Sequence, residues 1–125
     1  MNFPRYLQVA LALAAQNNQP KWKLAAVGAS GGAVQGVGIN TFEQNDSPPG
    51  TIDWFNLGRH AETNCLRSCG KVPKTIYVAR VTKNLVPALA LPCRNCYTSL
   101  SEAGVKRVVF TINESEFGTI NIKGV

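Results

Sequence analysis

The chain has 125 residues, of which 45% are hydrophobic and 16% charged, and its formal net charge is +6 at pH 7. This length suits a single core, so we expect residues 1–125 to form one domain. The apolar fraction excludes a disordered chain, and no apolar run reaches the roughly 18 residues that a membrane helix needs. The positive charge favours an anionic partner, a nucleotide or a nucleic acid, although the basic residues form no continuous run.

Apolar side chains recur at helical spacing between residues 3 and 17, which predicts an amphipathic helix at the start of the chain. Residues 6–15 also resemble the apolar part of a secretory signal peptide. Gln8 interrupts that run, however, so we interpret it as the first helix and expect a cytoplasmic protein.

A β-hairpin is predicted next. Residues 24–30 and 33–40 are small and apolar, and Gly31 and Gly32 between them can adopt the positive φ angles of a two-residue turn. Further glycines in the two runs weaken their strand propensity, but would let a helix or ligand approach the sheet closely: Gly28, Gly36 and Gly38.

Residues 41–59 show no clear periodicity and contain the turn sequence Asp46-Ser47-Pro48-Pro49-Gly50. Loops this long in a small domain are usually functional or disordered. Because this one leads directly to a histidine, we interpret it as a wall of the active site. Trp54 and Phe55 within it could stack on a base, or could instead anchor the loop on the core.

The second half of the chain alternates helices and strands, which predicts an α/β fold with a mixed sheet of about five strands and helices on both faces. The connection 113–118 is too short for the crossover of a parallel pair, so the last strand should be antiparallel. The predicted elements are a helix at 60–68 ended by Gly70, a strand at 75–81, a helix at 93–103 closed by Gly104, and strands at 105–112 and 119–122.

Three metal-ligating side chains fall at the starts of the two predicted helices. His60, Cys93 and Cys96 offer one imidazole and two thiolates, three of the four ligands that zinc binds, and leave a position for water. Glu62 is too close to His60 to be a natural fourth ligand, but is well placed to move protons. The order H-x-E and then P-C-x-x-C is the pattern of zinc-dependent nucleobase deaminases.

On these residues the chain resembles the cytidine/deoxycytidylate deaminase superfamily, which has a three-layer α-β-α fold. The resemblance implies a Zn²⁺ cofactor held by His60, Cys93 and Cys96. It implies that Glu62 is the general acid/base in the hydrolytic deamination of a cytosine ring, which yields a uracil product and ammonia.

The same resemblance implies a set of substrate contacts. Asn40, which ends the segment Gly38-Ile39-Asn40, would contact the sugar, and Ala61 with the backbone around Pro92 and Cys93 would hold the pyrimidine edge. A phosphate could meet one of four basic side chains: Arg59, Arg80, Lys83 and Arg94. A homo-oligomer is also implied by the family.

Departures from the family pattern bear on the substrate. Free-nucleoside deaminases use cysteine where this chain has His60, and tRNA adenosine deaminases usually have glutamate where it has Leu91. Deoxycytidylate deaminases match better, through His-Ala-Glu and a Gly-Val-Lys-x-Val strand at residues 104–108. The resemblance therefore favours deoxycytidylate as the substrate, although an antiparallel last strand is typical of nucleoside and base deaminases.

Two alternatives remain open. A polynucleotide deaminase acting on cytosine or adenosine would use the charge of +6 for backbone attraction and Trp54 and Phe55 for base stacking. A non-catalytic zinc or nucleotide-binding module would need a fourth protein ligand if its zinc were structural. Cys65 and Cys69 are the spare candidates, but helical geometry turns them roughly 140–180° away from His60. We interpret both as small buried hydrophobic side chains.

Overall fold

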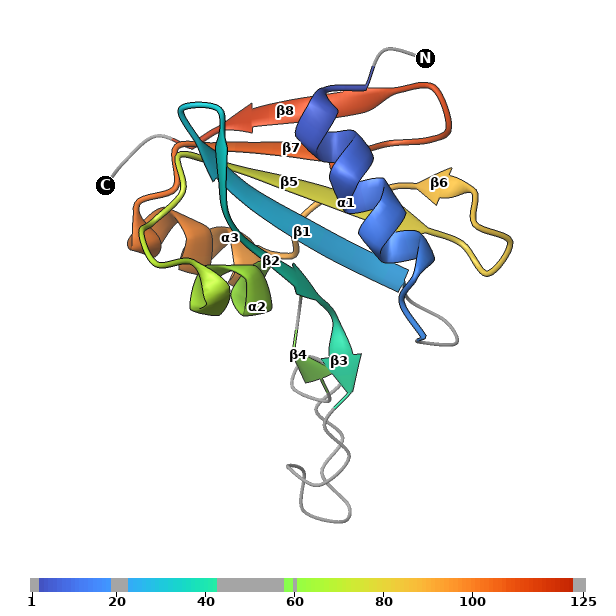
Figure 1. Ribbon diagram of the computed structural model, residues 1–125, viewed down its shortest axis with the longest axis horizontal. Coiled ribbons are helices and arrows are strands. Elements are labelled where there is room, and N and C mark those ends of the chain that lie inside the picture. The colour runs from blue at the N-terminus through green and yellow to red at the C-terminus, as the bar shows by residue number, and fades with distance from the viewer. Residues whose placement is uncertain (1–2, 19–22, 43–57, 60, 123–125) are drawn as a thin grey trace.

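The computed structural model describes residues 3–18, 23–42, 58–59 and 61–122. Within these ranges three helices cover the two faces of a six-stranded sheet (Figure 1). The helices are α1 (Arg5–Ala15), α2 (Ala61–Ser68) and α3 (Arg94–Ala103). The strands are β1 (Lys23–Ser30), β2 (Ala33–Ile39), β3 (Thr41–Phe42), β4 (Gly58–Arg59), β5 (Thr75–Val81), β6 (Pro87–Ala88), β7 (Arg107–Thr111) and β8 (Phe117–Asn121).

The sheet has the order β2-β1-β5-β7-β8, with β6 paired to β5. Among the described strands only β5 and β7 pair in parallel, and α3 lies in the connection between them. The last strand, β8, is antiparallel to β7, as its short connection predicted. The predicted mixed α/β fold is therefore confirmed.

Each face of the sheet has its own hydrophobic cluster. Helix α1 covers one face and buries Leu7, Ala10 and Ala14 completely. Helices α2 and α3 cover the other face, where Cys65 and Leu100 pack against strand residues such as Ile76, Val78 and Val108. Burying a side chain such as Leu7 of α1 or Leu100 of α3 contributes about 2 kcal/mol to the stability of the fold. Packing against the sheet therefore stabilises these two helices more than their own helix propensity does.

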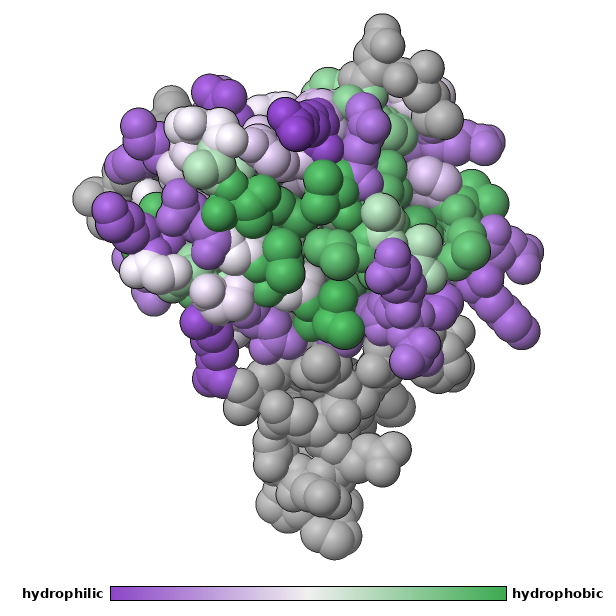
Figure 2. Space-filling model, viewed as in Figure 1, coloured by the Kyte–Doolittle hydropathy of each residue, from purple (hydrophilic) through white to green (hydrophobic). Residues whose placement is uncertain are grey.

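The face that carries α1 also exposes apolar surface (Figure 2). Val27 and Ala25 of β1 are buried and pack toward α1. Their partners on β2, Val37 and Ile39, are each about 40% exposed. Helix α1 therefore leaves this flank of the sheet open. No helix among the described residues is long and apolar enough to cross a bilayer.

The hairpin turn is as predicted, with positive φ at Gly31 (57°) and Gly32 (81°), and Gly104 ends α3 with φ 101°. Gly70, predicted to end α2, does not have a positive φ, and α2 ends at Ser68. Two short pairings were not predicted: β3 with β4 inside the expected loop, and β6 with β5 inside the connection 83–91.

Candidate active site

Helix α2 lies close to strand β2 because two glycines leave room for its backbone. A Cβ atom at Gly38 would lie 2.3 Å from the amide nitrogen of Cys65 and 2.7 Å from the carbonyl oxygen of Ala61. One at Gly36 would lie 2.9 Å from the amide nitrogen of Cys69. Asn64 Nδ2 also donates a hydrogen bond of 2.7 Å to the carbonyl oxygen of Ile39. The first turn of α2 is thereby fixed against the end of β2.

This docking buries the start of α2. Ala61 is 1% exposed and Glu62, in the first turn of the helix, is 3% exposed. The Oε1 atom of Glu62 has essentially no accessible surface. A carboxylate is costly to bury, so this is an unusual position for a glutamate.

Cys93 and Cys96 lie at the start of helix α3. Cys93 is the N-cap, with an extended backbone (φ −68°, ψ 167°), and its Sγ accepts a hydrogen bond of 3.4 Å from the amide of Cys96. Pro92 precedes the cap and is half-buried, while Cys96 is 3% exposed. The P-C-x-x-C sequence therefore forms a helix N-terminus, as predicted.

Electrostatics show that the two helix starts converge. Burial raises the pKa of the Cys96 thiol, and the nearby negative charge of Glu62 and a hydrogen bond with Cys93 raise it further. The buried carboxylate of Glu62 and the buried thiol of Cys96 are therefore close to each other, and the half-buried Cys93 lies beside Cys96. Such a cluster of anionic donors is suited to a cation, since a metal-coordinating thiol is deprotonated outright.

The donor set fits zinc, which takes cysteine sulfur in both structural and catalytic sites. No group of three metal-binding side chains is found in the part of the chain that the structure describes. His60, the third predicted ligand, lies outside that part, as do Trp54 and Phe55. Of the predicted site residues that are described, the structure places Glu62 near Cys96 and Cys93 beside Cys96.

Asn40 lies at the end of β2, beside the start of α2. It is 7% exposed, and its Oδ1 accepts hydrogen bonds from Asn17 Nδ2 (2.5 Å) and from the backbone amide of Leu24 (3.1 Å). These bonds tie the end of β2 to the segment after α1 and to the start of β1. They fix the orientation of the amide side chain.

Thr111 is a positioning residue that the sequence analysis missed. It is completely buried at the end of β7, where its Oγ1 donates to the carbonyl oxygen of Ala88 (2.6 Å) and accepts from the amide of Arg80 (3.2 Å). Its own carbonyl oxygen accepts from the amide of Ala90 (2.9 Å). These bonds hold the segment that leads into Pro92. A single polar residue ending an apolar strand was the available signal.

The two remaining cysteines face the sheet. Cys65 Sγ donates to the carbonyl oxygen of Gly36 (3.5 Å), and burial together with the neighbouring Cys69 raises the pKa of Cys65 to about 12. All four described cysteines are free of disulfides. Cys65 is fully buried, which agrees with its interpretation as a small hydrophobic side chain, whereas Cys69 is half-buried.

Comparison with known families decides the classification. Residues 2–112 match the family described as the cytidine and deoxycytidylate deaminase zinc-binding region. The chain belongs to this deaminase family. No match to a curated protein was found.

Solved structures of deaminases share its fold. Cytidine deaminase from Burkholderia pseudomallei is 20% identical with a TM-score of 0.71, over 98% of this chain and 94% of that one. The dCMP deaminase of cyanophage S-TIM5, in complex with dCMP and dUMP, is 19% identical with a TM-score of 0.62, over 84% and 76% of the two chains. Cytidine deaminase from Mycobacterium leprae is 16% identical with a TM-score of 0.60, over 94% of each chain.

Proposed function

We propose that this member of the deaminase family catalyses the zinc-dependent hydrolytic deamination of a cytosine nucleotide or nucleoside, and that its preferred substrate is deoxycytidylate. The observation that carries the proposal is that the buried Glu62, at the start of α2, lies near Cys96, which follows Cys93 at the start of α3. Water replaces the exocyclic amine at C4 of the ring, so that the products are the uracil compound and ammonia.

In this proposal His60, Cys93 and Cys96 hold the Zn²⁺ ion. Bound zinc supplies a water molecule that is acidic near neutral pH. Cys93, as the N-cap, places its sulfur at the start of α3. Cys96 follows on the first turn, so one short segment presents both sulfurs on a rigid element.

Glu62 moves the protons. Its carboxylate accepts a proton at the start of the reaction and delivers protons to ring N3 and to the departing amine. Its burial at the start of α2 keeps bulk water away from the carboxylate, and the docking of α2 on Gly38 fixes its position. A proton carrier needs such a fixed position within hydrogen-bond reach of the substrate.

Substrate recognition is proposed from the family resemblance. Asn40 contacts the sugar, Ala61 and the backbone at Pro92 hold the pyrimidine edge, and Trp54 and Phe55 stack on the base. The buried, hydrogen-bonded setting of Asn40 supports a fixed polar contact. The S-TIM5 enzyme, crystallised with dCMP and dUMP, supports a nucleotide as the ligand.

One observation favours a second candidate within the same chemistry. A net charge of +6 would attract a polynucleotide, whose cytosine or adenosine bases the site would deaminate. A non-catalytic zinc or nucleotide-binding module is the alternative from another class.

We also propose that residues 1–125 form one domain, that the protein is cytoplasmic and that it forms a homo-oligomer. The exposed Val37 and Ile39 of β2 support the homo-oligomer, because apolar side chains on an open flank of the sheet could be buried against a second copy.

The test is ammonia release by the purified, zinc-loaded protein on a panel of substrates. The panel contains dCMP, dCTP, deoxycytidine, cytidine, cytosine, adenosine and single-stranded DNA. We expect the highest kcat/KM on dCMP. Turnover on DNA alone would replace the nucleotide proposal by the polynucleotide one, and zinc retention without any turnover would favour the binding module.

A further inference from the structure

A cavity lies at the end of the sheet opposite to the starts of α2 and α3. It has a volume of about 410 Å³ and opens on the face that carries α1, beyond the point where that helix stops covering the strands. Pockets for small molecules usually measure roughly 300–1,000 Å³. The cavity is therefore large enough for a small ligand.

The floor of the cavity is a row of cross-strand neighbours. Ala29 of β1 pairs with Thr75 of β5, Thr75 with Arg107 of β7, and Arg107 with Asn121 of β8. All four line the cavity. Directly paired side chains on one face lie roughly 5 Å apart, so Arg107 has a hydroxyl and an amide as its immediate neighbours.

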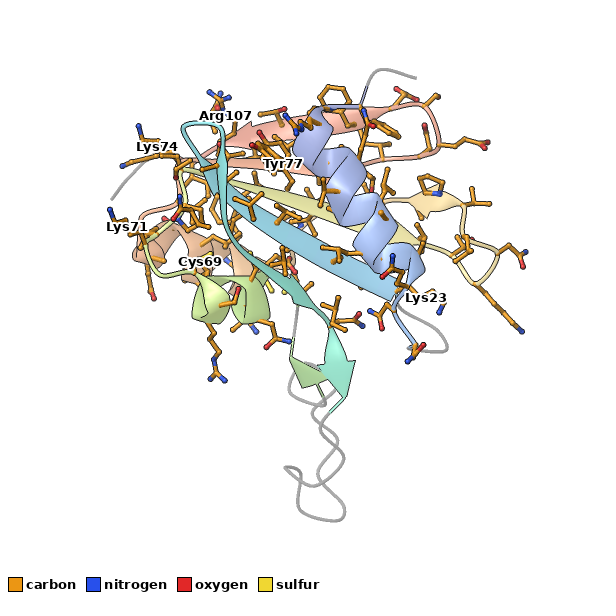
Figure 3. All side chains as sticks on the ribbon, in the orientation of Figure 1. Lys23, Cys69, Lys71, Lys74, Tyr77 and Arg107 are labelled. Atoms are coloured by element: carbon orange, nitrogen blue, oxygen red, sulfur yellow. The ribbon has the colours of Figure 1, made fainter. Side chains whose placement is uncertain are left out.

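Two lysines and a tyrosine complete the polar lining. Lys74 precedes β5, Lys106 precedes β7, and Tyr77 lies two residues beyond Thr75 on the same face of β5. Figure 3 shows Lys74, Tyr77 and Arg107 near the β1–β2 turn, far from Lys23 at the other end of the molecule. Three cations and no acidic side chain line the cavity in the described part of the chain.

Hydrogen bonds between three loops make this arrangement rigid. The amides of Lys106 (2.9 Å) and Arg107 (3.0 Å) both donate to the carbonyl oxygen of Lys74. The amide of Lys74 in turn donates to Ser30 Oγ (2.8 Å), at the start of the hairpin turn. The backbone segments that carry the three cations are thereby held side by side, so that their exposed side chains start from fixed positions around one cavity.

The first turn of α1 forms one wall. The hydroxyl of Tyr6 donates to the carbonyl oxygen of Gly32, and its ring packs on Tyr77 with centroids 5.6 Å apart. Tyr6 therefore joins the helix start to the hairpin turn.

We propose that this cavity binds a small ligand through a phosphate or diphosphate group. Arg107 offers a planar fork of donors to phosphate oxygens, and Lys74 and Lys106 add point charges. The cavity is bounded by Tyr6 and the hairpin turn, whereas a polynucleotide needs a continuous basic track. This geometry favours a small phosphorylated molecule over a nucleic acid strand.

The site is separate from the deaminase site. Arg80, which bonds to Thr111 beside the Pro92 segment, lies five residues beyond Thr75 on β5, about 17 Å along an extended strand. A ligand here would occupy the end of the sheet opposite to Glu62 and Cys93. Binding at this cavity is therefore independent of whether the proposed reaction takes place.

Isothermal titration calorimetry tests the proposal with inorganic diphosphate and cytidine diphosphate as probes, on zinc-loaded wild-type protein. Arg107→Gln removes the central cation, and Arg67→Gln is the matched control, because Arg67 is an exposed residue of α2 outside the cavity. We expect Arg107→Gln to weaken diphosphate binding at least about tenfold, and Arg67→Gln to change it less than twofold.

Each outcome bears on the proposal. If Arg107→Gln folds poorly by circular dichroism, Lys74→Ala and Lys106→Ala, both at exposed positions, provide the same comparison. The comparison counts only the binding that Arg107→Gln weakens, because the proposed active site also accepts cytosine nucleotides and does not contain Arg107. Tighter Arg107-dependent binding of cytidine diphosphate than of diphosphate would identify a nucleotide as the source of the phosphate; equal Arg107-dependent binding would identify the free anion. The proposal is overturned if neither probe binds at millimolar concentration, if both Arg variants lose affinity equally, or if only a single-stranded oligonucleotide depends on Arg107.

Discussion

Cys93 has two structural roles at the start of α3. Its backbone and side chain cap the helix, and its sulfur faces the buried Cys96. Serine is an even better N-cap than cysteine, so the variant Cys93→Ser should keep the helix. The variant thus separates the capping role of the residue from its role as a ligand.

We predict that Cys93→Ser loses stoichiometric zinc while keeping its helical circular dichroism spectrum. Elemental analysis of the purified protein measures the zinc content. Cys69→Ser, at a half-buried cysteine that faces the sheet, should keep one zinc per chain. One full zinc per chain in Cys93→Ser would show that this sulfur is not a ligand.

Because of Cys65, the free energy of unfolding should decrease as the pH rises into the alkaline range. Its pKa is about 12 in the folded chain, above the ordinary thiol value of 9.0, so the unfolded chain releases this proton first as the pH rises. Stability is thus lost above pH 9, by about 1 kcal/mol between pH 8 and 10. Urea unfolding at both pH values should show a smaller loss for Cys65→Ala. Equal losses in the two proteins would contradict this account.

Single residues also show where sequence reasoning stops. The pattern was sufficient to pick out Glu62, Cys93 and Cys96, because the chemistry needs those side chains at short, regular spacings. It could not show that Asn40 accepts a bond from Asn17, since nothing local links residues 23 positions apart. Thr111 was missed for the same reason: its partners come from β5 and β6.

At the scale of elements, the position of α2 depends on Gly38. A Cβ atom there would meet backbone atoms of α2, which cannot rotate away as a side chain would. The helix itself would have to shift, and Glu62 is in its first turn. The close contact between β2 and α2 is therefore a condition for the geometry of the site.

We predict that Gly38→Ala lowers the free energy of unfolding by about 3 kcal/mol and reduces both zinc content and turnover. Gly70→Ala is the control, because nothing lies within 4 Å of its Cβ and its φ is not positive. Denaturant unfolding of the two variants gives the comparison. If Gly38→Ala were as stable as Gly70→Ala, the packing account would be wrong.

The elements that the sequence predicted well are those with strong local signals. The β-branched run Thr75–Val81 is a strand with the predicted bounds, and Gly104 closes α3 in the left-handed conformation. Strands β3, β4 and β6 have two residues each and depend on a partner elsewhere in the chain. Gly70 failed as a cap because α2 ends earlier, where Ser68 Oγ bonds to the carbonyl oxygens of Val37 and Cys65.

At the scale of the whole molecule, the sheet separates two chemically different ends. The starts of α2 and α3 meet at one end, where thiols and a carboxylate are buried. The other end gathers cations from three separate segments. That second site could not be predicted from the sequence, because Thr75, Arg107 and Asn121 become neighbours only once the strand order is known.

The most direct test of the account is ammonia release by zinc-loaded Glu62→Gln beside wild-type protein, with dCMP as substrate. The change keeps the size of the side chain but removes its ability to carry the proton. Glu102→Gln, at an exposed position of α3, is the matched control. We predict that kcat falls roughly 10²–10⁴-fold in Glu62→Gln with zinc content and fold unchanged, and stays at the wild-type value in the control. Turnover by Glu62→Gln within a few-fold of wild type would contradict the central claim.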